Sequence, residues 1–326
     1  MLRIYLLRDA ILEEVEVSAG DDRLASAIWV DMIEPSKEEE LAVEALLGID
    51  APSREEMRGV ESSSQLYHEG NATVMTIRVL SVSGRPSPAL TATTFILTPE
   101  RLVTLRYNES TAFRSSAARA AKEAGAFNSP DAAMAGLVEA IVDRVAEVLE
   151  GIGDQLDQLS TQLFTQNNEI TQGIANSDLH SVLKGIGRNG DLASRTRESL
   201  LSISRIMPAL KGEEASRPSQ EIAKRLVTVN KDVKSLLDHA AFLSAKVQFL
   251  LDSALGLISI QQNAIIKIFS VAAVIFLPPT LIASIYGMNF EHMPELKWGL
   301  GYPFALGMMV VSAILPYWYF KRRKWL

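Results

Sequence analysis

The stretch IFSVAAVIFLPPTLIASIYGMN, residues 268–289, decides the fold of this chain. Ile268 to Tyr286 carry no charged side chain, and their length is close to the ~20 residues that a membrane-spanning helix needs. A second uncharged stretch of similar length runs from Tyr302 to Phe320. We therefore expect a transmembrane hairpin whose spans cover about 265–286 and 302–320, joined by an extracytoplasmic loop over 287–301.

The charges around this hairpin predict its orientation. Lys267 precedes the first span and the basic run Lys321–Lys324 follows the second, whereas the loop carries only Lys297 against Glu291 and Glu295. Short segments rich in Lys and Arg stay on the cytosolic side of a membrane. Both ends of the chain are therefore expected in the cytosol, with 321–326 as a basic cytosolic tail.

Composition excludes several classes of protein. The chain has 326 residues, a net charge of −7, no cysteine and four scattered histidines, which excludes a disulfide framework and makes a zinc enzyme an unsuitable interpretation. The first segment, Met1–Val17, mixes charged and apolar residues and so lacks the apolar core of a signal peptide. Since no nucleophile with a matching base stands out, we predict no enzyme and no cofactor.

The charge of the soluble part is strongly negative. The whole chain has 32 Lys and Arg against 39 Asp and Glu, and the segment after Ala264 accounts for 6 and 2 of these, so the remainder carries about −11. A nucleic-acid partner is not predicted, because binding phosphates requires a basic stripe. An acidic domain near a membrane instead raises the local concentration of cations.

Residues 1–126 are predicted to form a cytosolic α/β domain. Ser36 and Glu39 have the spacing of a capping box for a helix that reaches Leu47, where Gly48 ends it. Residues 127–217 show only helical periodicity and are predicted as a cytosolic helical domain, so the fold class is α+β. The strands are expected at Leu2–Leu7, Ala27–Asp31, Ala72–Val82, Ala92–Thr98 and Arg101–Tyr107.

Residues 218–286 are predicted as one long stem helix that continues as the first membrane span. Its apolar seam, in alternating steps of four and three, is Ile222, Leu226, Val229, Val233, Leu236, Ala240, Leu243, Val247, Leu250, Ala254 and Leu257. Such a seam needs partner helices, either from its own chain or from identical subunits. Because two spans cannot enclose an aqueous path, a transport role requires an oligomer, and we expect the seam to provide a means of assembly.

A second stripe runs through the same helix on a different phase. It consists of Asp252, Gly256, Ser259, Asn263, Ile266, Ser270, Ala273, Leu277, Thr280, Ser284 and Gly287. Small and polar residues dominate this polar stripe, and in hydrocarbon such a face turns toward helices or water rather than lipid. It predicts either a pore lining or close helix packing.

The segment Gly185-Ile186-Gly187-Arg188-Asn189-Gly190 matches the dinucleotide fingerprint G-x-G-x-x-G. No strand precedes it and no βαβ unit surrounds it, as that fingerprint requires. We expect a turn between helices here and no nucleotide partner.

Tyr286-Gly287-Met288-Asn289, followed by Met293-Pro294-Glu295-Leu296 and a second span with a basic tail, closely resembles the CorA family of divalent-cation channels. The likeness is strong over Gln261–Leu326, and Ala27–Pro35 is similar to the N-terminal domain of bacterial members. It implies a funnel-shaped homopentamer in the bacterial inner membrane, surrounded by lipid, whose first transmembrane helix lines the pore. The transported ions would be Mg²⁺ and also Co²⁺ and Ni²⁺.

The resemblance implies a selectivity filter at Gly287, Met288 and Asn289. Mg²⁺ dehydrates reluctantly, so the hydrated ion would be held through its waters by Asn289 side-chain carbonyls and Gly287 backbone carbonyls. Glu291 and Glu295 would attract cations to the outer mouth, although acids in a short loop are as often plain solvated charges.

The polar stripe supplies the other pore positions. The pore-lining candidates are Asn263, Ile266, Ser270, Ala273, Leu277, Thr280 and Ser284. Leu277 and Ile266 are candidate rings for a dewetted constriction, with lipid or interhelix packing as the alternative. Asp252, about three turns before the membrane, is the candidate for the inner mouth.

In the family, intracellular Mg²⁺ also binds between neighbouring cytosolic domains and holds the pore closed. Thr228 occupies the stem position where some members have an acid, which leaves Asp232 and Asp238 as regulatory candidates. The alternative for each is a solvated charge on a long helix.

Two other functions stay open. A zinc transporter of the related ZntB branch has similar architecture but varies the middle residue of Gly-Met-Asn, so Met288 and Met293–Leu296 favour the magnesium channel. A non-conducting, membrane-tethered metal sensor would leave the polar stripe unexplained.

Overall fold

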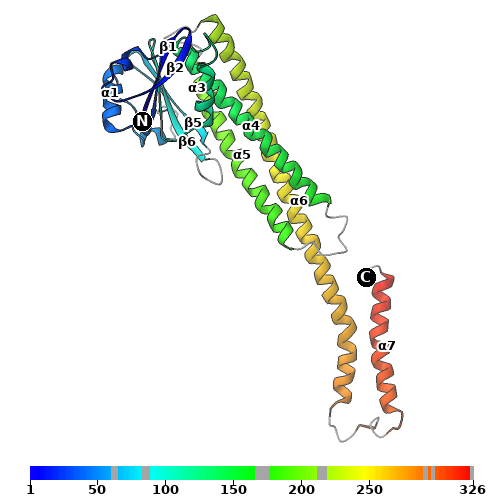
Figure 1. Cartoon of the computed structure of the whole chain (residues 1–326). Helices are drawn as coiled ribbons and strands as arrows, with labels where there is room; N and C mark the ends of the chain where they lie inside the picture. The colour runs from blue at the N-terminus through cyan, green and yellow to red at the C-terminus, as the bar shows by residue number, and fades with distance from the viewer. Residues whose placement is uncertain are drawn as a thin grey trace. The chain divides into compact units, whose positions relative to one another are not determined.

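The computed structural model describes residues 1–59, 65–81, 89–165, 176–210, 219–288, 293–294 and 298–323 (Figure 1). These residues form two compact units, Met1–Leu250 and Leu251–Leu326. The division falls inside the long helix α6 (Gln220–Tyr286), where the sequence predicts a continuous stem and span. The domain boundaries predicted at 126 and 217 stay predictions.

The first unit contains a seven-stranded sheet of order β2-β1-β3-β7-β6-β5-β4. Neighbouring strands are antiparallel except β3 and β7, which are parallel in a register that pairs Trp29 with Leu102. This mixed sheet with separate helices confirms the α+β class. The strands are β1 (Leu2–Arg8), β2 (Ile11–Val17), β3 (Trp29–Ile33), β4 (Leu66–Glu69), β5 (Ala72–Ser81), β6 (Ala89–Leu97) and β7 (Leu102–Arg106), and the short 3₁₀ turns are η1 (Asp22–Ser26) and η2 (Glu56–Arg58).

Two of these strands, β2 and β4, are absent from the sequence prediction. Strand β2 forms a hairpin with β1 through a turn at Asp9 and Ala10, whose φ angles of 51° and 63° suit a tight two-residue connection. Its alternation of buried Leu12 with exposed Glu13 is a half-buried strand pattern. The acidic residues conceal that pattern when the segment is read only for hydrophobicity.

Helix α1 (Lys37–Leu47) covers one face of the sheet and has the predicted ends. The Glu39 backbone N–H donates to Ser36 Oγ at 3.3 Å, and the Ser36 N–H donates to Glu39 Oε2 at 2.8 Å, which completes the capping box. Gly48 ends the helix with a φ of 69°, a left-handed conformation that glycine adopts without strain. Val43 anchors α1 in a core that also contains Leu2, Ile4, Val30, Met32, Val74, Ile96, Val103 and Leu105.

The opposite face of the sheet is covered by helices α3 (Thr111–Ala120), α4 (Pro130–Thr165) and α5 (Asn176–Leu210) (Figure 1). Aromatic side chains fill this side: Tyr5 stacks on Trp29 at 3.9 Å, and Phe113 of α3 lies 6.1 Å from Phe95 between ring centroids. The Trp29 indole N–H donates to Thr104 Oγ1 at 3.0 Å. Burial and the nearby carboxylates of Asp31 and Glu14 raise the pKa of Tyr5 well above its usual value, so Tyr5 stays neutral.

A buried ion pair joins β3 to β7 within this sheet. Arg106 donates from Nη2 to Asp31 Oδ2 at 2.7 Å and from Nε to Oδ1 at 3.1 Å, and both side chains are almost fully buried. Thr104 Oγ1 adds a 2.7 Å hydrogen bond to Asp31. A buried bidentate pair of this kind is costly to break from one side, because the remaining charge is left without a partner.

We expect Arg106→Leu to lower the free energy of unfolding by about 3–5 kcal/mol, because Asp31 then stays buried without its counter-charge. Thermal and urea denaturation of the purified full-length protein, followed by circular dichroism, measures the loss. Arg23→Leu is the matched control, since Arg23 contacts Asp21 at 2.7 Å with both side chains far more exposed, and it should barely move the melting temperature. Equal losses in both variants would contradict the assignment.

The first part of α6 packs against α4 and α5. Every seam position from Ile222 to Leu250 is buried or partly buried. Direct contacts fix the pairing: Lys246 Nζ lies 2.7 Å from Asp157 Oδ1 of α4, and Val247 meets α5 at Gly190. The expectation that this seam provides assembly is therefore wrong over Ile222–Leu250, because helices of the same chain already cover it.

The glycines of this helical layer allow the close approach. A Cβ added at Gly190 would lie 3.1 Å from Val247, and one at Gly185 would lie 3.0 Å from Leu159. Both glycines lie inside the continuous helix α5, so the predicted turn at 185–190 is wrong. Gly185 and Gly190 therefore serve interhelix packing, at the cost of the lower helix propensity of glycine.

Glu139 of α4 connects α3 with α6. Its carboxylate receives hydrogen bonds from Arg119 Nη2 at 3.0 Å and from Arg225 Nη2 at 2.7 Å. Burial alone would raise the pKa of Glu139, but the two guanidinium groups outweigh it and hold the pKa below its usual value of 4.5. The interaction therefore stabilises the fold above about pH 4.5 and is lost as the pH falls through the lower pKa of the folded state.

We expect Glu139→Gln to destabilise the protein by about 1–3 kcal/mol at pH 7, because the three hydrogen bonds from Arg119 and Arg225 lose the negative charge of their acceptor. The difference from wild type should begin to shrink below about pH 4.5 and disappear as the pH falls through the lower pKa of the folded state, where the wild-type carboxylate is itself protonated. Melting curves between pH 3 and pH 8 test this. Glu147→Gln, an exposed acid on the same helix, should give no such pH-dependent difference.

Candidate functional site

The second unit contains the two apolar helices that the sequence predicts. The last part of α6, ending at Tyr286, and helix α7 (Gly301–Arg322) are each long and apolar enough to cross a membrane, and only 6% of each most apolar segment is buried. Helix α7 begins where the Gly301 N–H donates to the Trp298 carbonyl at 2.9 Å. The observed helix extends the predicted span 302–320 by one residue at its start and two at its end.

Basic side chains at the end of α7 lie over aromatic rings. Arg322 is 5.3 Å from the ring centre of Trp318, and Lys321 is 5.9 Å from that of Tyr317. Aromatic rings and basic residues together are typical of the boundary between a bilayer and water. The cation–π pairs therefore mark one end of this span.

The polar stripe lies on an exposed side of α6 in this unit. All of the predicted pore positions, Asn263, Ile266, Ser270, Ala273, Leu277, Thr280 and Ser284, are exposed in the single chain. The less exposed positions are Val271, Ala272, Ile275, Pro278, Pro279, Ile282 and Tyr286. At about 100° per residue the two sets lie on opposite sides of the helix, so the chain itself leaves the stripe uncovered.

Pro278 and Pro279 do not interrupt α6, which continues to Tyr286. Neither proline has a backbone N–H, so the carbonyls of Val274 and Ile275 lose their usual helical donors. The Thr280 hydroxyl donates to the Phe276 carbonyl at 2.7 Å in the same turn. Backbone acceptors freed in the middle of a span are tolerated where protein or water can satisfy them.

Gly287 follows the last residue of α6, where its backbone lies close to the carbonyl of Ala283 without a left-handed turn. Its N–H donates to the Ala283 carbonyl at 2.9 Å, and an added Cβ would lie 3.1 Å from that same oxygen. Met288 follows with a half-exposed side chain and donates its N–H to the Ile285 carbonyl. Asn289, Glu291 and Glu295 lie outside the described residues.

The acidic candidates on α6 are not brought together. Asp232, Asp238 and Asp252 are each exposed, and by helix rise about 9 Å and then about 21 Å separate them along the axis. Within the described ranges, no group of three or more His, Asp or Glu side chains is arranged to hold a metal ion. A regulatory site built on these residues would need ligands from outside the single chain.

One acid absent from the sequence prediction lies near Asp232. Burial raises the pKa of Asp143 on α4, and the charges of Glu139 and Asp232 raise it further. This electrostatic influence joins residues far apart in the chain, so no local pattern could have indicated it.

Comparison with known proteins decides the family. A family model described as "CorA-like Mg2+ transporter protein" matches residues 25–322. The chain belongs to the CorA family. It is 34% identical to the magnesium transport protein CorA of Yersinia pseudotuberculosis and 33% identical to that of Escherichia coli K12, in both cases over 100% of each chain.

The solved structures of CorA relatives share the fold. The complete CorA magnesium transporter of Methanocaldococcus jannaschii matches with a TM-score of 0.74 at 16% identity, covering 100% of this chain and 99% of that one. The full-length CmaX protein matches at 0.68 with 16% identity, covering 99% and 97%. The cytoplasmic domain of ZntB from Vibrio parahaemolyticus matches at 0.51 with 10% identity, covering 77% and 95%.

These findings confirm the resemblance of the sequence to the CorA family and the predicted architecture of its chain. Members of this family are transporters or channels, so the interpretation as a non-enzyme is also confirmed. The roles of individual residues and the number of subunits stay predictions.

We expect the polar stripe to be accessible to water in the assembled protein. The chain has no cysteine, so Ser270→Cys and Ser284→Cys each introduce a single thiol on the stripe. A charged methanethiosulfonate reagent should modify these thiols in liposomes at least about tenfold faster than those of Phe269→Cys and Ile285→Cys, which neighbour them on other faces of the helix. Equal rates at all four positions would contradict a water-facing stripe.

Proposed function

We propose that this protein conducts hydrated Mg²⁺ across the bacterial inner membrane as a homopentameric channel. The observation that carries the proposal is the full-length identity of 33–34% to proteins named magnesium transport protein CorA. The basic residues at the C-terminal end of the chain support a cytosolic location for both of its ends. Co²⁺ and Ni²⁺ are expected as further substrates, and no cofactor is required.

The uncovered polar stripe supports an oligomeric pore. Two membrane helices cannot enclose water, and the seam of α6 is already occupied by α4 and α5 over Ile222–Leu250. The face that carries the stripe is uncovered in the single chain, so identical subunits can share it around an axis. Subunits joined by a cyclic symmetry would place Asn263, Ser270 and Ser284 in rings along the path.

The filter works on a hydrated ion. Mg²⁺ holds its waters tightly, so the first-shell waters donate hydrogen bonds to acceptor oxygens of the protein. A ring of Asn289 amides with Gly287 carbonyls supplies neutral acceptors, while Met288 packs behind it. Neutral oxygens bind the ion weakly enough to release it, as conduction requires.

The remaining candidates complete the path. Glu291 and Glu295 concentrate cations at the outer mouth, and Asp252 does the same at the inner mouth. Leu277 and Ile266 form apolar rings that close the path by dewetting. Intracellular Mg²⁺ closes the channel by binding preferentially to that state, with Asp232 and Asp238 as candidate ligands.

Zinc transport is the nearest competing function. The fold alone does not separate the two functions, because the cytoplasmic domain of ZntB also matches the fold of this chain, with a TM-score of 0.51 at 10% identity. Met288 between Gly287 and Asn289 favours magnesium, as does Met293-Pro294-Glu295-Leu296.

Ion flux into liposomes tests the proposal. We expect wild type to admit Mg²⁺ without a pH gradient, and Asn289→Ala to lose roughly tenfold or more of that flux or its selectivity, because the waters of the ion lose their acceptors. Gln261→Ala removes an amide from another face of α6 and should leave flux unchanged. Internal Mg²⁺, varied separately, should reduce the wild-type flux.

Three outcomes would reject parts of the proposal. Proton-stimulated Zn²⁺ uptake with negligible Mg²⁺ flux would assign the protein to the zinc branch. Flux of neither ion would favour the membrane-tethered sensor. Full Mg²⁺ selectivity and flux in Asn289→Ala would remove the filter role of that residue.

A further inference from the structure

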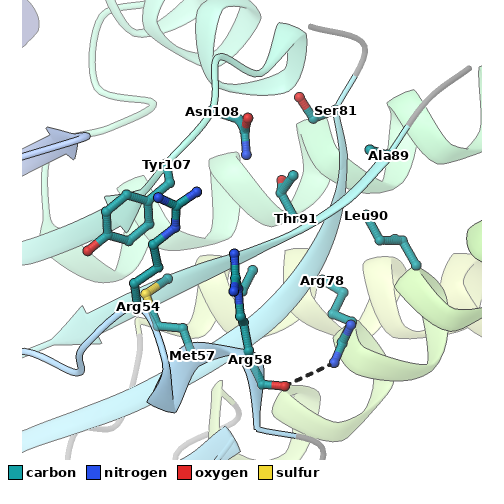
Figure 2. A pocket seen from close by; sticks show the side chains of 11 residues that line it. Arg54, Met57, Arg58, Arg78, Ser81, Ala89, Leu90, Thr91, Tyr107 and Asn108 are labelled. Atoms are coloured by element: carbon teal, nitrogen blue, oxygen red, sulfur yellow. Dashed lines mark hydrogen bonds between the residues drawn. The ribbon is translucent and has the colours of Figure 1, made fainter. Parts of the chain in front are cut away.

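The α/β part of the first unit contains a cavity of about 450 Å³ that ion conduction does not use (Figure 2). Its walls come from the η2 segment, from strands β5 and β6, and from the residues after β7. Its volume falls within the range of pockets that hold small organic ligands, about 300–1,000 Å³.

Three arginines gather at this cavity. Arg58 approaches from η2, Arg54 from just before it and Arg78 from β5, and no carboxylate is among the described residues that line the cavity. Within the described part of the chain, neither Arg54 nor Arg58 forms an ion pair with an acid. Such a concentration of positive charge in a chain of net charge −7 favours an anionic ligand.

Two of these arginines, Arg54 and Arg78, have side-chain contacts that hold them in place. The Arg54 guanidinium lies 4.9 Å from the centre of the Tyr107 ring, as Figure 2 shows. Arg78 pairs with Glu198 at 3.4 Å and donates from Nη2 to the Arg58 carbonyl at 3.4 Å. Arg78 therefore fixes the backbone at Arg58, while the Arg54 and Arg58 side chains keep donors for a ligand.

The other walls indicate the class of anion. Two guanidinium forks match the oxygens of a phosphate group, each with paired N–H donors. Asn108 and Thr91 add polar groups across the cavity, and Met57 and Leu90 add apolar surface. The cavity is larger than a phosphate group alone needs, so the ligand also has an organic part.

We propose that this arginine cavity binds a small organic phosphomonoester, with Arg54 and Arg58 on the phosphate and Met57, Leu90 and Tyr107 against the organic part. The phosphate can belong to a free metabolite or to a lipid headgroup, since the chemistry of the contact is the same. The proposal stands independently of the ion that the protein conducts.

Equilibrium dialysis of the full-length protein, with Mg²⁺ omitted, tests the free ligand. Radiolabelled AMP and glycerol 3-phosphate are the probes, and adenosine and glycerol are their uncharged counterparts. We expect saturable binding of the phosphorylated probes alone, weakened at least about tenfold in Arg54→Gln/Arg58→Gln. Vesicles of phosphatidylcholine with and without phosphatidic acid test the headgroup, and binding confined to phosphatidic acid would assign the site to lipid.

Matched variants separate the site from general charge and from folding. Arg188→Gln/Arg197→Gln removes the same charge from exposed positions of α5 and should bind as wild type. Arg54→Lys/Arg58→Lys retains the positive charge but lacks the paired N–H donors of the guanidinium groups. It should bind the phosphorylated probes more weakly than wild type but better than Arg54→Gln/Arg58→Gln. Melting temperatures of all variants confirm folding.

Three results would overturn the proposal. The first is no binding of either phosphorylated probe or of phosphatidic acid vesicles. The second is equal loss of binding in the two glutamine double variants, which would show only nonspecific attraction. The third is a changed subunit number in Arg54→Gln/Arg58→Gln without any phosphate binding by wild type, which would assign the arginines to a contact between copies of the chain.

Discussion

The close packing of α6 against α4 and α5 constrains the rest of the structure. Gly185 and Gly190 let the helices approach to distances at which an added Cβ would press on Leu159 and Val247. Over Ile222–Leu250 the apolar seam is covered by helices of the same chain, so this part of it cannot also join subunits. The same packing determines which faces of α6 are available. Because one side of the helix is packed against α4 and α5, only its other sides can contact partner subunits, lipid or water.

The features that the sequence predicts well are local ones. The two apolar spans, the capping box at Ser36 and the stop at Gly48 depend on neighbouring residues and appear where expected. The features it misses depend on distant contacts. Asp31 and Arg106 are 75 residues apart, and the glycine pattern at 185–190 has a role only once Leu159 and Val247 are beside it. Short patterns therefore predict elements better than they predict what the elements touch.

The residues of the candidate pore can be predicted from the sequence, but a single chain does not form a complete pore. Ser270, Leu277 and Ser284 follow a helical period and are exposed as the pattern requires, yet a ring needs several copies of each. Ion choice is harder still, because the magnesium and zinc branches share a fold. In the proposed channel it would depend on the few residues around Met288, so that selectivity would come from local chemistry and not from architecture.

Helix α6 also determines how any ligand of the first unit can influence the span. Among the described helices, α6 alone contributes residues to both units, so coupling between the proposed sites at Asp232 and Leu277 would pass through the backbone of that helix. Its seam is fixed by packing, and packed interfaces shift between discrete arrangements in preference to deforming continuously. Coupling therefore requires α6 to move relative to α4 or α5, and the Glu139 contacts with Arg119 and Arg225 are among the interactions that such a movement must break or carry along.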